Sequence, residues 1–312
     1  MQVGNNNVVE KEALVKDILR LRGERNAVIL AHNYQRPEIQ DLADFVGDSL
    51  ELARKAQTTD AKVVVFCGVD FMAETAAIVN PDKTVLIPAW EAMCPLAAML
   101  PPEVIKRARE EHPGAEVVMY VNTSAAAKVY ADIICTSANA VAVTNSMESD
   151  TILFAPDKNL AYYVQQRTKK KVIPVPDYGI CAVHHNIKAG HIEDAKRLHP
   201  QAKVTVHPEC PPEVQVIANH IGSTKAMVEY VRTDTAKEYI VGTEVDILHR
   251  MRKEAPGKIF HPACDSAICR NMKKNTLENL HEALLNMQYK VELPQKIADA
   301  ARKPIERMLR IV

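Results

Sequence analysis

One segment pattern occurs three times in the 312-residue chain. An apolar run, a proline, a short loop and a cysteine follow one another in TVLIPAWEAMC, KVIPVPDYGIC and IFHPACDSAIC, which end at Cys94, Cys181 and Cys269. These cysteines are 181 − 94 = 87 and 269 − 181 = 88 residues apart. An apolar run that leads into a proline and a polar loop predicts a buried strand with a loop at its carboxyl end. The chain is therefore expected to present three equivalent loops, each with one cysteine.

Other features repeat at the same spacing. Three short segments match one another: DLADFVGDS (41–49), VYADIICTS (129–137) and QVIANHIGST (215–224). The residues expected to end the first strand of each copy also align: His32, Tyr120 and His207. Several features at one register predict three copies of one β/α unit. We expect these units to span 1–112, 113–200 and 201–312. The third range includes C-terminal helices, for which packing against the first unit is one expected arrangement.

Strands and helices alternate along each predicted unit. In the first unit, strands are expected at 27–32, 62–71 and 84–88. Helices are expected there at 9–22, at 33–56 with a break at Gly47–Asp48, and at 101–112. Near the C-terminus, two more helices are expected within 276–287 and 295–310. Such alternation is typical of parallel strands with helices on both faces. The predicted fold class is α/β, with three pseudo-threefold-related αβα three-layer domains. Their strand ends are expected to face one central active-site cleft.

Composition and charge exclude several classes of protein. Lys+Arg and Asp+Glu are both 39, and a nucleic-acid-binding protein usually has a basic excess. No apolar run is long enough to cross a bilayer, and the amino terminus lacks the pattern of a signal peptide. We therefore expect a cytoplasmic protein that binds neither nucleic acid nor membrane. Seven cysteines in a reducing compartment favour metal binding or catalysis over disulfides.

The repeated cysteines are candidate metal ligands. Cysteine is common in apolar cores, and four cysteines that occur in one copy only are assigned there: Cys67, Cys135, Cys210 and Cys264. Thiolates favour zinc, copper(I) or iron–sulfur clusters. Three thiolates without a fourth would leave one iron of a [4Fe-4S] cluster open to bind a substrate hydroxyl or carboxylate. A structural zinc site is normally closed by four protein ligands, so the missing fourth copy favours a catalytic cluster.

Polar residues recur at two further positions of the repeat. The pairs Asp48–Ser49, Thr136–Ser137 and Ser223–Thr224 each precede a predicted helix. They are typical helix caps, and helix amino-termini that face one cleft would also bind anions. The second set follows the first strands: His32-Asn33-Tyr34, Tyr120-Val121-Asn122 and His207-Pro208-Glu209. Histidine, tyrosine and glutamate are frequent proton-transfer groups, so this set predicts a ligand-facing wall.

The chain resembles quinolinate synthase of the cluster-containing A type along nearly its whole length. The matching stretches include LAHNYQ (30–35), DFVGDS (44–49), GVDFMAE (68–74), MCPLA (93–97), YVNTSA (120–125), CTSANA (135–140), PDKNLA (156–161), HPECP (207–211), GTE (242–244) and CRNMKKNTLENL (269–280). The resemblance implies three αβα domains around one [4Fe-4S] cluster per chain. It also implies condensation of iminoaspartate with dihydroxyacetone phosphate, which yields quinolinate, phosphate and water in NAD biosynthesis. An L-aspartate oxidase or dehydrogenase would supply the iminoaspartate.

The resemblance also assigns roles to individual residues. The cluster ligands would be Cys94, Cys181 and Cys269. The substrate contacts would be His32, Ser49, Tyr120, Asn122, Ser137, His207, Glu209 and Thr224. Tyr34 and Glu209 match the acid–base residues of the family, and His207 is the next candidate for the base. The chain has Pro212 where some members have lysine, and Cys264 lies where some relatives carry cysteines that form a regulatory disulfide.

One alternative from another functional class stays open. A non-catalytic iron–sulfur redox sensor that binds an anionic metabolite would also need three thiolates and an anion site. Such a sensor would not need a paired acid and base at the strand ends. Turnover of the two substrates under anaerobic conditions distinguishes the two hypotheses.

Overall fold

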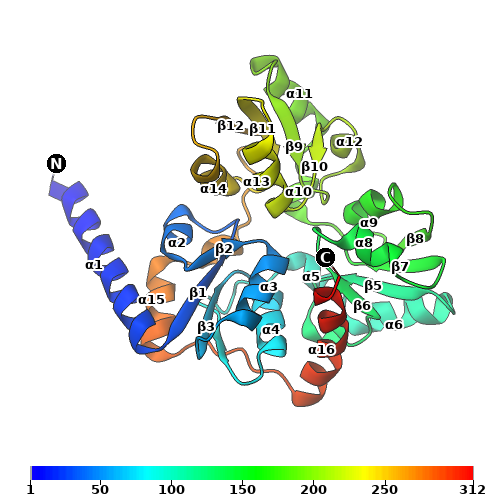
Figure 1. Ribbon diagram of the computed structural model, residues 1–312, viewed down its shortest axis with the longest axis horizontal. Helices are drawn as coiled ribbons and strands as arrows, with labels where there is room; N and C mark the ends of the chain where they lie inside the picture. Colours follow the sequence, from blue (N-terminus) through cyan, green and yellow to red (C-terminus); the bar gives the residue numbers. More distant parts are fainter. Residues whose placement is uncertain (1, 312) are drawn as a thin grey trace.

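The computed structural model describes residues 2–311, which form three parallel sheets around a common centre (Figure 1). The first sheet contains β1 (Ala27–His32), β2 (Phe45–Gly47), β3 (Val63–Cys67) and β4 (Thr84–Leu86). The second contains β5 (Glu116–Tyr120), β6 (Ile133–Cys135), β7 (Thr151–Ala155) and β8 (Lys171–Pro174). The third contains β9 (Lys203–Val206), β10 (His220–Ile221), β11 (Glu238–Gly242) and β12 (Ile259–Pro262). This arrangement confirms the predicted α/β class.

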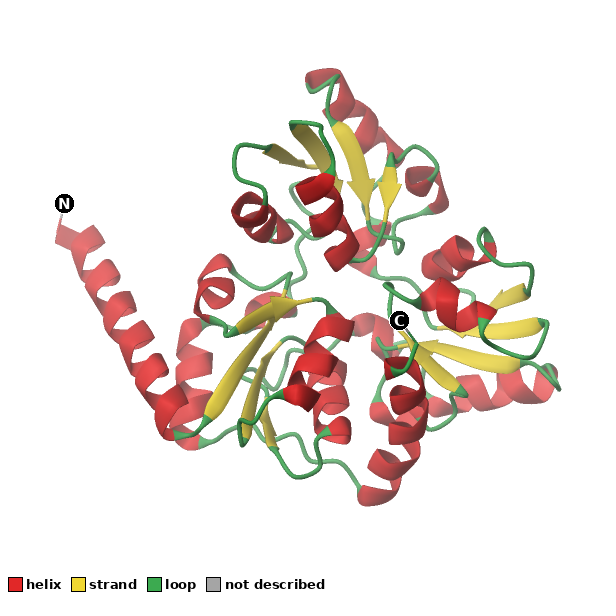
Figure 2. Cartoon of the chain, in the orientation of Figure 1, coloured by secondary structure: helices red, strands yellow, loops and turns green. Residues whose placement is uncertain are grey.

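Each sheet has the same strand order. The strand orders are β2-β1-β3-β4, β6-β5-β7-β8 and β10-β9-β11-β12. In every unit the first strand along the chain therefore lies between the second and the third, and the fourth lies at the edge beside the third. All pairs are parallel; Ile29 pairs with Val65, for example, and Ile240 pairs with Val204. Parallel strands need crossover connections, which the intervening helices supply. In Figure 2 the strand arrows of all three sheets point toward the middle of the molecule, so their carboxyl ends share one region.

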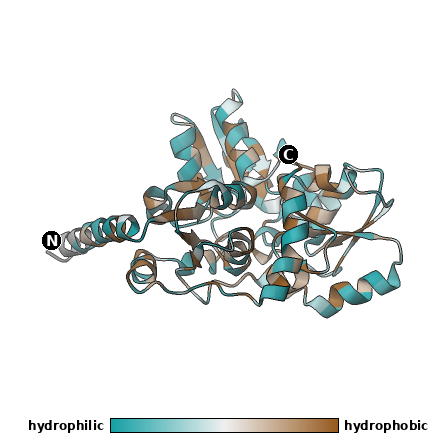
Figure 3. Cartoon of the chain, turned by 60° about the horizontal axis from the view of Figure 1, so that its bottom comes forward, coloured by the Kyte–Doolittle hydropathy of each residue, from teal (hydrophilic) through white to brown (hydrophobic). Residues whose placement is uncertain are grey.

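Helices cover the sheets. The first unit contains α1 (Gln2–Glu24), α2 (Pro37–Leu42), α3 (Ser49–Thr58), α4 (Asp70–Val79), α5 (Pro95–Ala98) and α6 (Pro102–Glu111). The second contains α7 (Ala125–Lys128), α8 (Ala140–Asn145), α9 (Lys158–Gln165), α10 (Ala182–His185) and α11 (Ala189–Leu198). The third contains α12 (Pro212–Gln215), α13 (Thr224–Thr233), α14 (Ile247–Glu254) and the 3-10 helix η1 (Met272–Lys274). Apolar residues colour much of the strands in Figure 3, whereas the helices carry hydrophilic stretches.

Two C-terminal helices join the units. Helix α15 (Leu277–Asn286) packs against α1 and β3, and Arg25 donates to the carbonyl of Leu284 at 3.2 Å. Helix α16 (Gln295–Leu309) packs against α4 of the first unit and against α7 and β6 of the second. Its Arg302 donates to the carbonyl of Ile78 at 2.9 Å. The C-terminal segment therefore holds the first two units together. None of the helices within residues 2–311 has the length and apolar composition of a membrane span.

Two local predictions were wrong. The segment 33–56 was expected to be helical with one break, but it also contains β2. Strands β2, β6 and β10 are edge strands of two or three residues, too short for a periodic pattern to reveal. The strand expected at 62–71 ends at Cys67, and α4 begins at Asp70. Gly68 and an aspartate at the helix start mark this boundary.

A buried side chain fixes the loop after the first strand of each unit. Gln40 Nε2 donates to the carbonyl of Gln35 at 2.8 Å, and Gln215 Nε2 donates to the carbonyl of Cys210 at 2.8 Å. In the second unit the equivalent residue is Lys128, whose Nζ donates to the carbonyl of Thr123. The register is that of the cysteines, because 128 − 40 = 88 and 215 − 128 = 87. These three side chains hold in place the loops that carry the polar strand-end residues.

Replacing Lys128 with glutamine is expected to stabilise the protein at neutral pH. Burial lowers the pKa of Lys128 from 10.5 to about 8, although Glu74 and Asp70 oppose the change. At about 1.4 kcal/mol per pH unit, protonated Lys128 costs at most roughly 3 kcal/mol at pH 7. The other units show that a glutamine reaches the equivalent carbonyl.

The pH dependence has a defined sign. Between pH 8 and 10.5 the unfolded chain retains the Lys128 proton more strongly than the folded chain, so the native protein gains stability as the pH rises. The advantage of Lys128→Gln should therefore be largest at pH 7 and should shrink toward pH 10. Urea unfolding at pH 7 and pH 9.5 measures the difference. A pH-independent difference, or a less stable variant at pH 7, would contradict the interpretation.

Candidate active site

A cavity of about 500 Å³ lies where the three units meet. All the residues predicted to form a site line it: His32, Tyr34, Ser49, Cys94, Tyr120, Asn122, Ser137, Cys181, His207, Glu209, Thr224 and Cys269. They come from strand ends, helix starts and cysteine loops of all three units. The structure therefore brings together the three sets of residues that the repeat aligned.

The three repeated cysteines have similar surroundings. Cys94 and Cys181 immediately precede α5 and α10, and Cys269 lies before η1. Burial raises the pKa of each thiol. A hydrogen bond from a backbone N–H acts in the opposite direction and lowers the pKa; the donor is Ala97 for Cys94, His184 for Cys181 and Met272 for Cys269. Each sulfur thus lies at the amino end of a helical turn, where N–H groups stabilise a thiolate.

The three repeated cysteines do not form a compact group of the kind that holds a single ion. Metal–sulfur bonds of about 2.3 Å would bring two sulfurs on one zinc ion to within about 4.6 Å of each other. Among residues 2–311, the three cysteines do not form a group whose ligand atoms all lie within 4.8 Å.

The remaining cysteines differ in position. Cys67, Cys135 and Cys210 are fully buried, as expected for core residues. The assignment of Cys264 to the core was wrong, because this residue is half-buried and lines the cavity, with its Sγ 3.2 Å from Ser266 Oγ. All seven cysteines are free thiols. Pro212 is the first residue of α12 and is half-buried.

Two strand-end histidines are neutral hydrogen-bond donors. The backbone N–H of Tyr34 donates to His32 Nδ1 at 3.2 Å, and that of Glu209 donates to His207 Nδ1 at 3.3 Å. Burial lowers the pKa of both imidazoles to about 3, so both are uncharged at neutral pH. Because Nδ1 accepts a hydrogen bond, the ring proton is on Nε2. His207 Nε2 lies 3.2 Å from Ser137 Oγ, which belongs to another unit.

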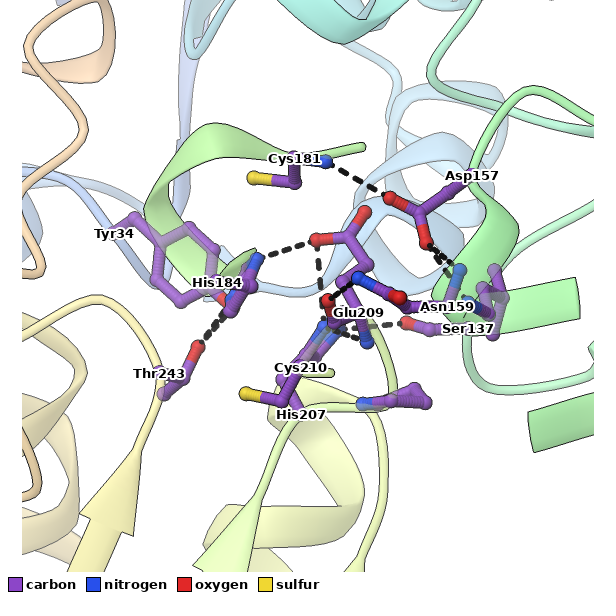
Figure 4. A network of polar contacts seen from close by, with 12 residues as sticks. Tyr34, Ser137, Asp157, Asn159, Cys181, His184, His207, Glu209, Cys210 and Thr243 are labelled. Atoms are coloured by element: carbon purple, nitrogen blue, oxygen red, sulfur yellow. Dashed lines mark hydrogen bonds and ion pairs between the residues drawn. The ribbon is translucent and has the colours of Figure 1, made fainter. Parts of the chain in front are cut away.

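A chain of polar contacts connects Glu209 with Tyr34 (Figure 4). His184 Nδ1 lies 2.6 Å from the Glu209 carboxylate, and His184 Nε2 lies 2.8 Å from Thr243 Oγ1. The Tyr34 hydroxyl is 2.6 Å from the same Thr243 oxygen and 3.3 Å from His184 Nε2. The sequence prediction did not include His184 or Thr243. The repeat could not reveal His184, because its equivalents are Ala97 and Met272.

The protonation states of Glu209 and Tyr34 differ. Burial raises the pKa of Glu209, but His184 and His207 lower it by more, to about 2. Burial also raises the pKa of Tyr34 well above its usual value, so the phenol keeps its proton. The pair therefore combines a carboxylate that can accept a proton with a phenol that can donate one.

Two buried oxygen atoms in the cavity wall have no hydrogen-bond partner within residues 2–311. They are Glu209 Oε1 and Asn122 Oδ1. Buried polar atoms are nearly always paired, so such atoms indicate contacts with a ligand or with water. Their position supports a polar ligand in this part of the cavity.

The predicted helix caps are present in two of the three units. Asp48 accepts from the backbone N–H groups of Leu50 and Glu51 at the start of α3, and Ser223 caps α13. In the second unit the prediction was wrong, because α8 begins at Ala140, after the Thr136–Ser137 pair. Asn139 Oδ1 accepts the N–H of Thr136 instead. The second residue of each pair lines the cavity, and none of the three serves as a cap.

Comparison with known proteins identifies the family. The family described as Quinolinate synthetase A protein matches residues 16–310. The chain belongs to this family of enzymes. Quinolinate synthase of Pyrococcus horikoshii is 56% identical over 296 residues, which cover 95% of this chain and 98% of that protein. Quinolinate synthases of Thermococcus onnurineus and Methanoregula boonei are 54% and 53% identical, over 96% and 95% of this chain and 99% and 97% of those proteins. The resemblance stated from the sequence is thereby confirmed.

Proposed function

We propose that the chain is a quinolinate synthase that condenses iminoaspartate with dihydroxyacetone phosphate and releases phosphate and water in NAD biosynthesis. The observation that carries this proposal is the meeting, in one cavity, of three thiols from three units and the polar chain from Glu209 to Tyr34. Family membership supports it. Iminoaspartate would come from an L-aspartate oxidase or dehydrogenase.

Cys94, Cys181 and Cys269 are proposed to hold one [4Fe-4S] cluster per chain. The cavity geometry fits this group, because each unit contributes one thiol at the amino end of a helical turn. When bound, the cluster would supply an open iron that acts as a Lewis acid on a hydroxyl or carboxylate. All other steps below concern the side chains of the protein.

Substrate binding is assigned to the neutral and hydrogen-bonding groups of the wall. Both substrates are anionic, and the amino-termini of α3 and α13 reach the cavity at Ser49 and Thr224. His32 and His207 present N–H donors, for which carboxylate or carbonyl oxygens are suitable acceptors. Thr224 Oγ1 also accepts from Asn33 at 2.7 Å, which joins the first and third units beside the cavity.

Proton transfer is assigned to Glu209, His184 and Tyr34. Glu209 would take a proton from a carbon next to an imine or carbonyl and share it with His184 Nδ1, 2.6 Å away. His184 Nε2 contacts Thr243 and Tyr34, so the phenol can return a proton to an oxygen or nitrogen of the reacting molecule. The neutral tautomer of His207 suits a donor, which makes Glu209 the better candidate for the base.

Anaerobic turnover tests the proposal. Purified protein supplied with both substrates should form quinolinate, detected by its absorbance, and omission of either substrate should prevent it. A redox sensor would bind an anion without turnover. The buried acid–base chain favours catalysis, since anion binding alone does not require it.

Alanine at Ser137 or Thr224 is expected to weaken binding of a dicarboxylate without a comparable loss of stability. Neither hydroxyl caps a helix, so the cap loss of about 1 kcal/mol should be absent. Thr224→Ala also removes the 2.7 Å hydrogen bond from buried Asn33, so Ser137→Ala is the cleaner of the two variants for this comparison. Thr276→Ala is the matched control, because Thr276 caps α15 and does not line the cavity. Calorimetry and thermal unfolding measure both quantities. Unchanged affinity in Ser137→Ala and Thr224→Ala would remove these residues from the binding site.

A further inference from the structure

Three carboxylates contact the cysteine loops at the same position of the repeat. Asp70 accepts the backbone N–H of Cys94 at 2.9 Å, and Asp157 accepts that of Cys181 at 2.9 Å. Glu244 accepts the N–H of Cys269 at 3.2 Å. The acids are spaced like the cysteines, because 157 − 70 = 87 and 244 − 157 = 87. Each acid follows the third strand of its unit.

A second hydrogen bond joins the same two segments in every unit. The backbone N–H of Asp70 donates to the carbonyl of Ala92 at 2.8 Å. In the other units, Lys158 donates to Gly179 at 2.9 Å and Val245 donates to Ala267 at 3.0 Å. The end of each third strand is thus bonded to its cysteine loop both through the backbone and through a carboxylate.

Two of these acids use both oxygen atoms as acceptors. Asp157 Oδ2 binds the Cys181 N–H, while Oδ1 caps α9 by accepting from Asn159 at 2.9 Å and from Leu160 at 2.8 Å. Glu244 Oε1 accepts from Cys269 and also pairs with Lys273 Nζ at 2.7 Å, while Oε2 accepts the N–H of Asp246. An amide side chain has only one acceptor oxygen, so it cannot replace either acid fully.

Another side-chain contact that occurs in all three units does not require an acid. Asp44, Asp132 and Asn219 accept backbone N–H groups of the first strands, from Ile29 at 2.9 Å, from Val117 at 2.7 Å and from Val204 at 2.8 Å. One of these three is an asparagine, so a neutral side chain is sufficient for that contact. All three residues at the cysteine loops are acids. Asp157 and Glu244 have 0% of their surface exposed, and buried carboxylates are costly unless they are well hydrogen-bonded.

We infer that Asp70, Asp157 and Glu244 are positioning residues that orient the three cysteines for a shared metal cluster. This inference rests on the proposed cofactor. The three thiols come from three separate units, so no single segment sets their mutual arrangement. Fixing the cysteine N–H orients the backbone at the residue that carries the thiol. Groups that orient metal ligands typically change metal affinity about 10–100-fold when they are removed.

The test compares Asp157→Asn with the native chain and with Asp132→Asn. The asparagine can keep the cap of α9 with its oxygen, and it then turns an N–H₂ group toward the Cys181 N–H. After anaerobic reconstitution, iron loss to a chelator is followed by the visible absorbance of the cluster, and thermal unfolding is recorded alongside. Asp157→Asn should lose iron on the order of tenfold faster than the native chain, compared at a temperature well below the melting temperatures of both proteins. Asp132→Asn should lose it at the native rate.

The outcomes separate this inference from the cofactor proposal. Native iron retention in Asp157→Asn, with or without a lower melting temperature, would overturn the positioning role while leaving the cluster assignment intact. If the native chain itself took up no iron–sulfur cluster, both would be wrong. Asp70→Ala and Glu244→Gln extend the test to the other two units, and faster iron loss in all three variants would support the inference.

Discussion

Single replacement of Cys94, Cys181 or Cys269 with alanine is expected to abolish the proposed iron–sulfur cluster. Each thiol comes from a different unit, and the cavity wall offers no further repeated cysteine as a substitute. Two remaining thiolates would leave two of the four irons without protein ligands, which should prevent stable assembly. Iron content and visible absorbance after anaerobic purification measure the effect.

Two other cysteines provide the controls. Cys67 is fully buried in β3, and burial raises the pKa of its thiol to about 12, so Cys67→Ala should keep the cluster. Cys264 lines the cavity but is outside the repeat, so Cys264→Ala should also keep it. Full iron content in any variant of the three repeated cysteines would refute the ligand assignment.

The repeat made much of this site predictable from the sequence. The strand-end residues, helix-start residues and cysteines each occur three times at spacings of 87 or 88, and a parallel sheet places such positions at one edge. The prediction needed no contact information, because copies of one unit around a centre present equivalent positions to each other. Every set contributes residues from all three units to the cavity wall.

Features without a repeated sequence signal were not predictable in this way. His184 occurs in one unit only, and its contacts with Glu209 and Thr243 depend on how the second and third units pack. The edge strands β2, β6 and β10 were missed because two or three residues contain no measurable period. The carboxylates Asp70, Asp157 and Glu244 do share the register, but acidic residues near helix starts are common, so their contact with the cysteines emerged only from the structure.

Glu209→Gln is expected to retain the cluster and to bind substrate but to lose at least about a hundredfold in turnover. General acid–base groups typically contribute roughly 10²–10⁴-fold to a rate. Glutamine preserves the size of the side chain and one acceptor oxygen, but it cannot take a proton. The His184 Nδ1 atom, 2.6 Å from the carboxylate, would then face an amide, so the connection to Tyr34 would also lose its proton acceptor. Glu213→Gln, an exposed position outside the cavity, is the control and should keep near-native turnover.

Tyr34→Phe should produce a similar loss by interrupting the other end of the same chain. The phenol keeps its proton because burial raises its pKa. Its removal takes away the hydroxyl partner of Thr243, while His184 keeps its contacts with Thr243 and Glu209. Because Glu209 remains intact in this variant, proton abstraction can still occur, and a bound intermediate is expected to accumulate. Rapid-quench analysis of a single turnover would detect it. Near-native turnover in Glu209→Gln would instead assign the base elsewhere, with His207 as the next candidate despite its neutral tautomer.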